Sequence, residues 1–313
     1  MAASGFAGLE NSPLARIGYY NKIISKGWET DFLPLITNTE IDGRLFQCNQ
    51  MIQFTKQPTT GPWRRDYEKN QELILDQVSP EAFTMVCYES AYKAIKFDKL
   101  DVMRICERWA EFERGFIDDM YHTLSEMWHA YVLNTMVLGA AARNKGNAAG
   151  RSGNVNLGTT GAAVVITGLN LASELAKLKR VLMEARRWRE GEMFILVPPA
   201  ILEQFVTSPF ANALQMGNCV DCSLLATGEV PNKIMGFTVI QSDQIPSVID
   251  PVTLNESYMI IAGHRMATAF VGDIIEADID KVANSFGHAY RVLTVWGSQV
   301  IYPDALAVGY WTV

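Results

Sequence analysis

The feature that most constrains the fold is a long apolar stripe between residues 98 and 138, where large apolar side chains recur every three or four positions. This spacing is typical of one face of an α-helix. Asp98 or Asp101 can cap its start by accepting a hydrogen bond from a free backbone amide. At about 1.5 Å per residue the unbroken helix would approach about 60 Å, longer than a compact domain of this size needs. A kink or break, if present, is expected at Gly115. The stripe comprises Val102, Ile105, Trp109, Phe112, Phe116, Met120, Leu124, Met127, Tyr131 and Leu138.

Composition limits both the architecture and the partners. The chain has 313 residues, of which 49% are hydrophobic and 19% charged, so it can bury a core and exceeds the usual size of one domain. We therefore expect two linked lobes, or one lobe with long extensions. A formal net charge of -7 argues against a protein that wraps nucleic acid by neutralising its phosphates. Any contact with DNA is expected to be local and weak.

The cysteines and the uncharged stretches argue against a secreted or membrane protein. The cysteines are odd in number and mostly isolated, which argues against a disulfide scaffold and favours a reducing compartment. The first residues lack the positive and apolar regions of a signal peptide. The longest uncharged stretch, residues 152–173, is interrupted by Gly and Asn, whereas a membrane helix needs about 20 mainly apolar residues. The cysteines are Cys48, Cys87, Cys106, Cys219 and Cys222.

The segments before the long helix predict an arm and a hairpin. Residues 1–42 have irregularly spaced apolar side chains with Pro13 and Pro34, which favours an extended arm. Residues 45–56 alternate apolar and polar side chains, as a half-buried strand does. A turn cluster at 58–62 follows, and strand-forming residues resume at 73–75 and 83–97. We expect a long two-stranded hairpin that rests on a neighbour, because an isolated hairpin is only marginally stable.

The segments after the long helix predict a loop, a basic helix and a buried strand. Residues 144–168 are rich in Gly, Asn, Ala and Thr, which favours a mobile loop leading to a short strand. An amphipathic helix over 171–188 carries basic residues beside its apolar stripe. Since aromatic residues do not interleave with these cations, we expect a solvated or inter-subunit face rather than a site for single-stranded nucleic acid. Residues 193–197 predict a strand buried on both faces, and Pro198–Pro199 open another short helix.

A metal site on the long helix is the first chemical hypothesis. His122, Glu126 and His129 stand four and three residues apart, so all three side chains can point to one side. A carboxylate-bridged di-iron bundle also needs a second Glu-x-x-His and two more carboxylates. Neither His264 nor His288 has a Glu three residues before it. Polar contacts along the helix are the favoured interpretation, and no metal or cofactor is expected.

A thiol site is the second chemical hypothesis. Cys219 and Cys222 have the spacing of a redox motif, but that chemistry needs the first thiol at a helix start directly after a strand. The preceding residues, Met216 to Asn218, are typical of a loop. A structural zinc site would need a second pair of ligands at similar spacing. Phosphate-binding, nucleophile-elbow and zinc-protease signatures are absent from the sequence, so no catalytic residue is assigned.

The C-terminal part resembles the C-terminal half of tailed-bacteriophage major capsid proteins. The resemblance rests on a glycine-led strand at 234–240, a gap with Pro246, a strand at 286–297 that closes on Gly297, and the segment 302–306 with Pro303. The order of the other elements is similar to that family along nearly the whole chain. The resemblance implies an α+β fold of the tailed-phage and herpesvirus type, with an N-terminal arm, an extended β-hairpin loop, a long spine helix, a peripheral domain and an axial domain.

The resemblance also implies a division of the chain and a function. The arm would be 1–42, the hairpin 43–97, the peripheral domain with its spine helix 98–167, the axial domain 168–280, and the return to the peripheral domain 281–313. The subunit would assemble as pentamers and hexamers into an icosahedral shell around double-stranded DNA. We expect a separate scaffolding protein, because no long charged helical extension precedes the arm, together with a portal and a possible decoration protein. The location would be the virion capsid, and the host cytoplasm during assembly.

Assembly of this kind needs surfaces that are buried only between copies, and aromatic and Arg anchors carry such contacts. Trp63, Arg64, Arg65 and Tyr67 lie near the expected hairpin tip and are the predicted inter-subunit contacts. Two alternatives stay open at this point. One is an encapsulin-like nanocompartment shell with the same fold. The other is a metal- or thiol-dependent enzyme that uses the helix histidines or the Cys219 and Cys222 pair.

Overall fold

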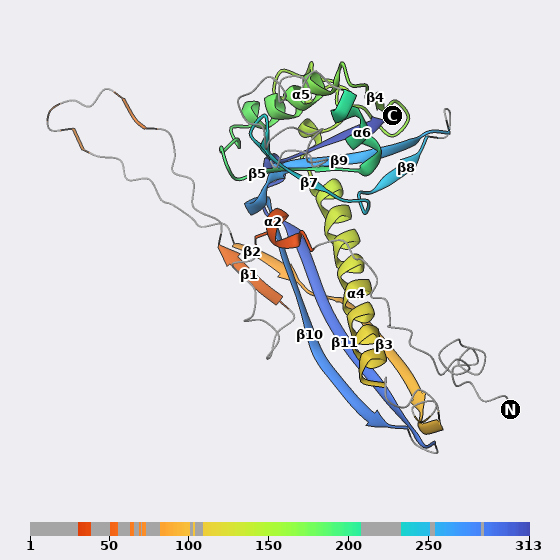
Figure 1. Cartoon of the computed structure of the whole chain (residues 1–313). Coiled ribbons are helices and arrows are strands. Elements are labelled where there is room, and N and C mark those ends of the chain that lie inside the picture. Colours follow the sequence, from red (N-terminus) through yellow and green to blue (C-terminus); the bar gives the residue numbers. More distant parts are fainter. Residues whose placement is uncertain are drawn as a thin grey trace, which may run out of the picture.

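The computed structural model describes residues 31–38, 51–55, 63–65, 69, 71–72, 82–100, 103, 109–207, 233–250, 254–282 and 285–313. These residues form three β-sheets, of which the smallest is the pair β1-β2. The two larger sheets are joined end to end, with a long helix running beside one of them (Figure 1). The spine sheet has three strands in the order β10-β11-β3. The large sheet has seven strands and carries helices on one side. The expected mixture of a long helix with strands is therefore present.

Helix α4 (Trp109–Gly139) is the predicted long helix. It runs for 31 residues without a break at Gly115, so it spans about 46 Å at about 1.5 Å per residue. Asp98 Oδ1 accepts a hydrogen bond from the Leu100 amide at 3.0 Å, which is the contact expected of a helix cap. The helix ends at Gly139, one residue after the predicted stripe, and residues 142–144 form a short 3₁₀ turn. At Gly139 a Cβ would lie within 2.5 Å of Val300, so the helix end is packed tightly against strand β11.

The buried face of α4 changes along its length. Phe116, Met120 and Tyr131 follow the predicted stripe toward the spine sheet, where Phe116 meets Phe97 and Tyr131 meets Trp296. In the last turns the buried side chains come from the opposite side of the helix, since a helix turns about 100° per residue. They are His129, Val132, Leu133, Met136 and Val137. Leu138 was predicted within the buried stripe, and this prediction is wrong, because its side chain is 80% exposed.

The described part of the predicted hairpin is shorter than its sequence pattern. Strand β1 (Met51–Thr55) pairs antiparallel with β2 (Ala82–Val86). Ile52, Met85 and Cys87 are buried against Val271 and Val295 of the spine sheet. The chain then leaves this pairing, and β3 (Glu89–Asp98) pairs antiparallel with β11 instead. Residues 89–97, predicted within the hairpin, therefore belong to the spine sheet.

The spine sheet is built from distant parts of the chain. Strands β10 (Thr268–Lys281) and β11 (Gly287–Val300) form a long antiparallel pair with a bulge between Ile274 and Glu276. One face of the sheet lies along α4, which Figure 1 shows running parallel to β11. The short helix α2 (Leu33–Ile36) sits at the upper end of this unit, where Asn38 bridges to Ala269. The spine sheet together with α4 and α2, called the spine unit below, therefore combines residues from both ends of the chain.

The large sheet is mixed, and its order is β4-β12-β9-β5-β7-β6, with β8 paired to β9. Its central strand β5 (Met193–Val197) is buried at every position, as predicted. Helix α6 (Pro199–Thr207) begins at the predicted proline pair, and α5 (Leu171–Glu184) buries its apolar stripe on the same core. The other strands are β4 (Val164–Val165), β6 (Lys233–Ile234), β7 (Phe237–Gln241), β8 (Ser247–Ile249), β9 (Glu256–His264) and β12 (Leu306–Thr312).

The two sheets exchange strands, so the predicted domain limits do not follow the sheets. Strand β10 was placed in the axial domain by the limit 168–280, but it lies in the spine sheet. Strand β12 was predicted to return to the peripheral domain within 281–313, but it lies in the large sheet. The chain crosses from β9 to β10 and back from β11 to β12. Each crossing falls at a short 3₁₀ turn rather than at a change in composition.

The predicted mobile loop at 144–168 is instead folded into turns on the core of the large sheet. Val155, Leu157 and Ile166 are buried there. The Asn144 side chain donates hydrogen bonds to the Asp304 and Leu306 carbonyl oxygens at 2.9 and 2.8 Å. Several of its glycines have positive φ, for example Gly158 at 82°. Glycine tolerates this backbone, and so the composition that suggested mobility serves tight turns here.

Candidate assembly surfaces

The predicted contact residues lie in the connection between β1 and β2. Trp63, Arg64 and Arg65 are described and exposed, and the Trp63 side chain is 96% exposed. Tyr67 lies outside the described residues. A fully exposed Trp is unusual for a subunit acting alone, because burying an aromatic side chain removes about 150–250 Å² of surface from water. The exposure of Trp63 makes this segment a candidate contact surface.

A second apolar surface, which the sequence did not reveal, covers the lower part of the spine unit. Strands β1 and β2 cover the face of the spine sheet opposite α4 only near Val271 and Val295. Beyond them Tyr92 of β3 is 82% exposed. Exposed apolar patches of this extent mark interaction sites more often than chance. Tyr92 lies on the face opposite α4, whereas Ile279 lies beside α4. Other exposed apolar residues of the spine strands and their surroundings are Tyr88, Leu100, Met103, Tyr121, Ile275 and Phe286.

A cleft opens on the α4 face of the spine sheet, between α4 and the β10–β11 pair. Its volume is about 200 Å³, and its wall is mainly apolar, with Ile117, Met120 and Tyr290 contributing. Asp278 and Arg291 lie at its border. Arg291 is ion-paired with Asp280, so the charged border is partly neutralised within the chain. At about 200 Å³ the cleft is smaller than the roughly 300–1,000 Å³ typical of small-molecule pockets.

The predicted helix histidines do not form a metal site. His129 is buried, and each of its ring nitrogens already has a polar partner: Nε2 lies 2.8 Å from Asp31 Oδ1, and Nδ1 lies 2.9 Å from Gln244 Oε1. Its ring stacks on Phe32 at 4.2 Å between centroids. The hydrogen bond from His129 lowers the pKa of Asp31. His129 therefore fixes residues 31–36 of the arm onto α4. Among the described residues no cluster of His, Cys, Asp and Glu could hold a metal.

This arrangement predicts that His129 matters for arm docking and not for metal. The change His129→Ala is expected to lower the free energy of unfolding by about 1–3 kcal/mol, because Asp31 and Gln244 each lose a hydrogen-bond partner. Adding EDTA is expected to leave the melting temperature unchanged. Glu126→Ala is the matched control, since Glu126 is exposed on the same helix. Urea titrations compare the three proteins, and bound metal that both substitutions remove would contradict this interpretation.

The basic side of α5 is solvated and partly paired within the chain, since Arg180 is 50% exposed and ion-paired with Glu184. Lys177 pairs with Glu174 at 2.6 Å. Lys179 donates to the Met235 carbonyl oxygen at 3.0 Å, and its ammonium lies 4.6 Å from the centre of the Trp188 ring. These contacts hold α5 against its own lobe. The basic helix is therefore not proposed as a partner surface.

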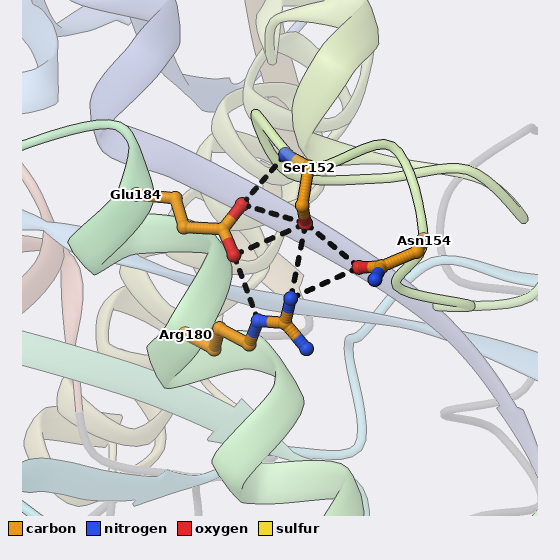
Figure 2. Close-up of polar contacts among 4 residues, drawn as sticks. All are labelled: Ser152, Asn154, Arg180 and Glu184. Atoms are coloured by element: carbon orange, nitrogen blue, oxygen red, sulfur yellow. Dashed lines mark hydrogen bonds and ion pairs between the residues drawn. The ribbon is translucent and has the colours of Figure 1, made fainter.

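A polar network fastens the loop at 150–154 to α5. Figure 2 shows Arg180 and Glu184 of α5 pointing toward Ser152 and Asn154 of the loop. The Ser152 amide donates to Glu184 Oε2 at 3.0 Å, Arg180 Nε donates to Glu184 Oε1 at 2.7 Å, and Arg180 also donates to Asn154 Oδ1 at 2.9 Å. The Ser152 amide first, and then the Arg180 guanidinium, lower the pKa of Glu184 to about 2.

The low pKa of Glu184 predicts a pH-dependent contribution to stability. A carboxylate whose pKa falls on folding, here from 4.5 to about 2, stabilises the fold above pH 4.5 and loses that effect as the pH falls toward 2. We expect Glu184→Gln to unfold at a lower temperature than wild type above pH 4.5, and the difference to shrink toward pH 2. Melting curves over this range measure it, with the exposed Glu190→Gln as control. A constant difference across the range would contradict the prediction.

The remaining sequence hypotheses concern the cysteines and a membrane-spanning helix. Cys219 and Cys222 lie outside the described residues, so the thiol hypothesis has no structural counterpart here. Cys87 is buried as a free thiol beside Gly297, and burial raises its pKa. No helix among the described residues has the length and apolar character required to cross a bilayer.

Comparison with known proteins gives matches at the level of structure. No protein-family model and no curated protein matches the sequence. The solved capsid of Cyanophage P-SCSP1u aligns with a TM-score of 0.66 at 15% identity, covering 94% of this chain and 91% of that chain. The structure of Mycobacterium phage Che8 aligns with a TM-score of 0.62 at 14% identity, covering 93% and 98%. The capsid of the empty GTA particle aligns with a TM-score of 0.57 at 12% identity, covering 95% and 96%. The chain therefore has the α+β fold of these phage capsid proteins along nearly its whole length.

Proposed function

We propose that this protein is the major capsid subunit of a tailed bacteriophage, which assembles with copies of itself into an icosahedral shell around double-stranded DNA. The observation that carries the proposal is that the capsid fold extends over more than nine-tenths of the chain in several independent solved structures. A fold alone does not fix a function, so the proposal also rests on which surfaces the chain leaves exposed.

The exposed apolar surfaces supply what assembly requires. Interfaces of standard size bury about 1,200–2,000 Å² in total and depend on a few aromatic and Arg residues. Trp63 with Arg64 and Arg65 forms one such group, and Tyr92 with Phe286 belongs to another on the spine unit. The polar network and paired cations of α5, in contrast, are satisfied within the subunit. The surfaces near β1–β2 and along the spine are therefore the proposed contacts between copies.

The same proposal assigns roles to the segments and partners. The segment between β1 and β2 would extend over a neighbouring subunit, as the hairpin at 43–97 was predicted to do. The large sheet with α5 and α6 would surround the five-fold and quasi-six-fold axes as pentamers and hexamers. A scaffolding protein, a portal and a decoration protein are the further proposed partners. The location would be the virion capsid, after assembly in the host cytoplasm.

The packaged DNA would be held by confinement rather than by tight binding. With a formal net charge of -7, the subunit lacks the excess of cations that releases counterions from DNA phosphates. Two cations of α5, Lys177 and Arg180, are already paired with Glu174 and Glu184. The lining would therefore contact DNA weakly and without sequence preference. A catalytic role is not part of the proposal.

Sedimentation velocity of the purified chain, alone and with the scaffolding protein encoded beside it, tests this function. The expected result is a fast, narrow sedimentation boundary, which indicates closed shells. These shells are expected to contain no protein cargo other than scaffold. Shells filled with one specific enzyme would instead support the nanocompartment alternative. A single slow species under both conditions would overturn the proposal.

A further inference from the structure

The two sheets meet at a joint in which two crossings of the chain are hydrogen-bonded to each other. Strand β9 passes into β10 through the 3₁₀ turn Arg265–Ala267. Strand β11 passes into β12 through Ile301, Tyr302 and the turn Pro303–Ala305. The Ala267 carbonyl oxygen accepts from the Ile301 amide at 2.8 Å and from the Tyr302 amide at 3.1 Å. The geometry of the first turn therefore fixes the position of the second crossing.

His264 closes the first turn. It is the last residue of β9, and its Nδ1 accepts a hydrogen bond from the Met266 amide at 3.1 Å. Its Nε2 lies 2.7 Å from Glu192 Oε2, at the start of β5, and the side chain is 12% exposed. An Nδ1 that accepts a hydrogen bond carries no proton, so Nε2 must carry it and donate to Glu192. The observed geometry therefore requires the neutral imidazole.

Protonation is incompatible with this turn. A proton on Nδ1 would face the Met266 N–H, and two donors would then point at each other. Three charged groups act on the ring: Glu192 favours the charged form, while Arg189 and Arg265 oppose it. Burial is the largest influence, and the net result is a pKa of His264 below its usual value. Burial and the geometry of the turn therefore both favour the neutral imidazole.

We propose that His264 is a pH-sensitive latch on the joint between the two sheets. While His264 is neutral, the turn Arg265–Ala267 is closed and holds the crossing at Ile301 and Tyr302. When His264 takes up a proton, the turn opens and the two sheets become free to change their relative orientation. The consequence for a shell, a change in its curvature, rests on the proposed function, whereas the latch itself does not.

The sign of the pH effect follows from linkage. Because the pKa of His264 is lower in the closed form than in the open one, the open form binds more protons. Opening is therefore favoured as the pH falls below about 6.5, the usual value for His. Coupling to a single proton limits the change in the opening equilibrium to about tenfold per pH unit.

Hydrogen exchange on the purified full chain, between about pH 7.5 and about pH 5, tests the latch. After correction for the intrinsic pH dependence of exchange, we expect the Met266, Ile301 and Tyr302 amides to exchange faster at the lower pH, by up to about tenfold per unit. Amides of the buried strand β5 serve as internal references. Unchanged protection of the joint amides over this range would overturn the proposal.

Three variants separate the latch from a general effect of acid. His264→Asn keeps an acceptor for the Met266 amide, since Asn bonds the backbone two residues on, and it is expected to abolish the pH response. Glu192→Gln keeps an acceptor for Nε2 but removes the charge that favours the protonated ring, so the response is expected to begin at the same pH and to extend to lower pH. His288→Asn, exposed on β11, is the matched control and is expected to behave as wild type. A response that persists in His264→Asn would contradict the proposal.

The readout distinguishes failure of the latch from failure of the proposed function. Exchange is measured on the chain whether or not it assembles, and shell formation is measured separately at neutral pH. Shells without a pH response at the joint would reject the latch alone. A pH response in a chain that forms no shells would support the latch and reject the proposed function.

Discussion

Replacing Trp63 and Arg64 together by alanine is expected to yield a folded subunit that no longer assembles into shells. Trp63 is 96% exposed, so its removal creates no cavity in the described core. Anchor residues of this kind cost about 2 kcal/mol or more per interface when truncated, and a shell repeats the same interface many times. The free energy of unfolding, obtained from thermal melting, is expected to change by no more than about 0.5 kcal/mol, as is typical of surface substitutions. Electron microscopy of the same samples reports assembly.

Lys69→Ala is the matched control, because Lys69 is exposed in the same connection between β1 and β2. Its shells are expected to form normally. Normal particles from the Trp63 and Arg64 double variant would show that this segment is not an essential contact. Attention would then move to the spine surface around Tyr92 and Phe286, where Tyr92→Ala is the next variant to assemble.

Leu133→Ala is expected to cause a large loss of stability. Leu133 is fully buried where α4, α2 and the large sheet meet. Truncation of a buried Leu costs about 2–5 kcal/mol, through lost burial and the cavity left behind. Leu138→Ala on the same helix is expected to cost no more than about 0.5 kcal/mol, because that side chain is 80% exposed. Urea unfolding of both variants measures the difference, and equal losses would show that α4 does not bury the face described here.

The local sequence pattern predicted those elements whose buried positions follow from the spacing of their apolar residues. The long helix, the fully buried strand β5, the proline-led α6 and the strand after Gly236 all lie where the sequence placed them. Helix α6 packs on one core, whereas the two faces of β5 bury alternate residues in two cores. Alternation or a three-to-four spacing then reports burial directly. Gly236 has a φ of 93°, which explains why a glycine precedes β7.

The sequence pattern did not predict burial correctly where the buried face of a helix changes along its length. It also did not predict the pairing of a strand with a distant part of the chain. The C-terminal turns of α4 have apolar residues on two sides of the helix. The side that includes Leu138 and the side that includes Leu133 have equally regular spacing, but only the side with Leu133 is buried. Strand β3 is mostly exposed, and its partner β11 lies about two hundred residues further along the chain. The exchange of β10 and β12 between the sheets depends on turns such as Arg265–Ala267, which carry no marked composition.

The candidate surfaces were predicted in part. The order of elements pointed to Trp63, Arg64 and Arg65, and their role as contacts stays a prediction. The spine surface was missed, although one signal was available: β3 reads Glu-Ser-Ala-Tyr-Lys-Ala-Ile-Lys-Phe-Asp, with Tyr92 next to Lys93 on a mostly polar and small-residue strand. The arm contact of His129 could not be foreseen, because Asp31 and Gln244 are remote in sequence and only the fold brings them together.

Negative-stain electron microscopy of the purified chain, expressed alone and with a candidate scaffolding protein, tests the central claim most directly. The account predicts closed shells or tubes of uniform width, built from pentamers and hexamers, in at least one of the two preparations. Monomers or dimers in both preparations, with the fold intact by circular dichroism, would contradict it.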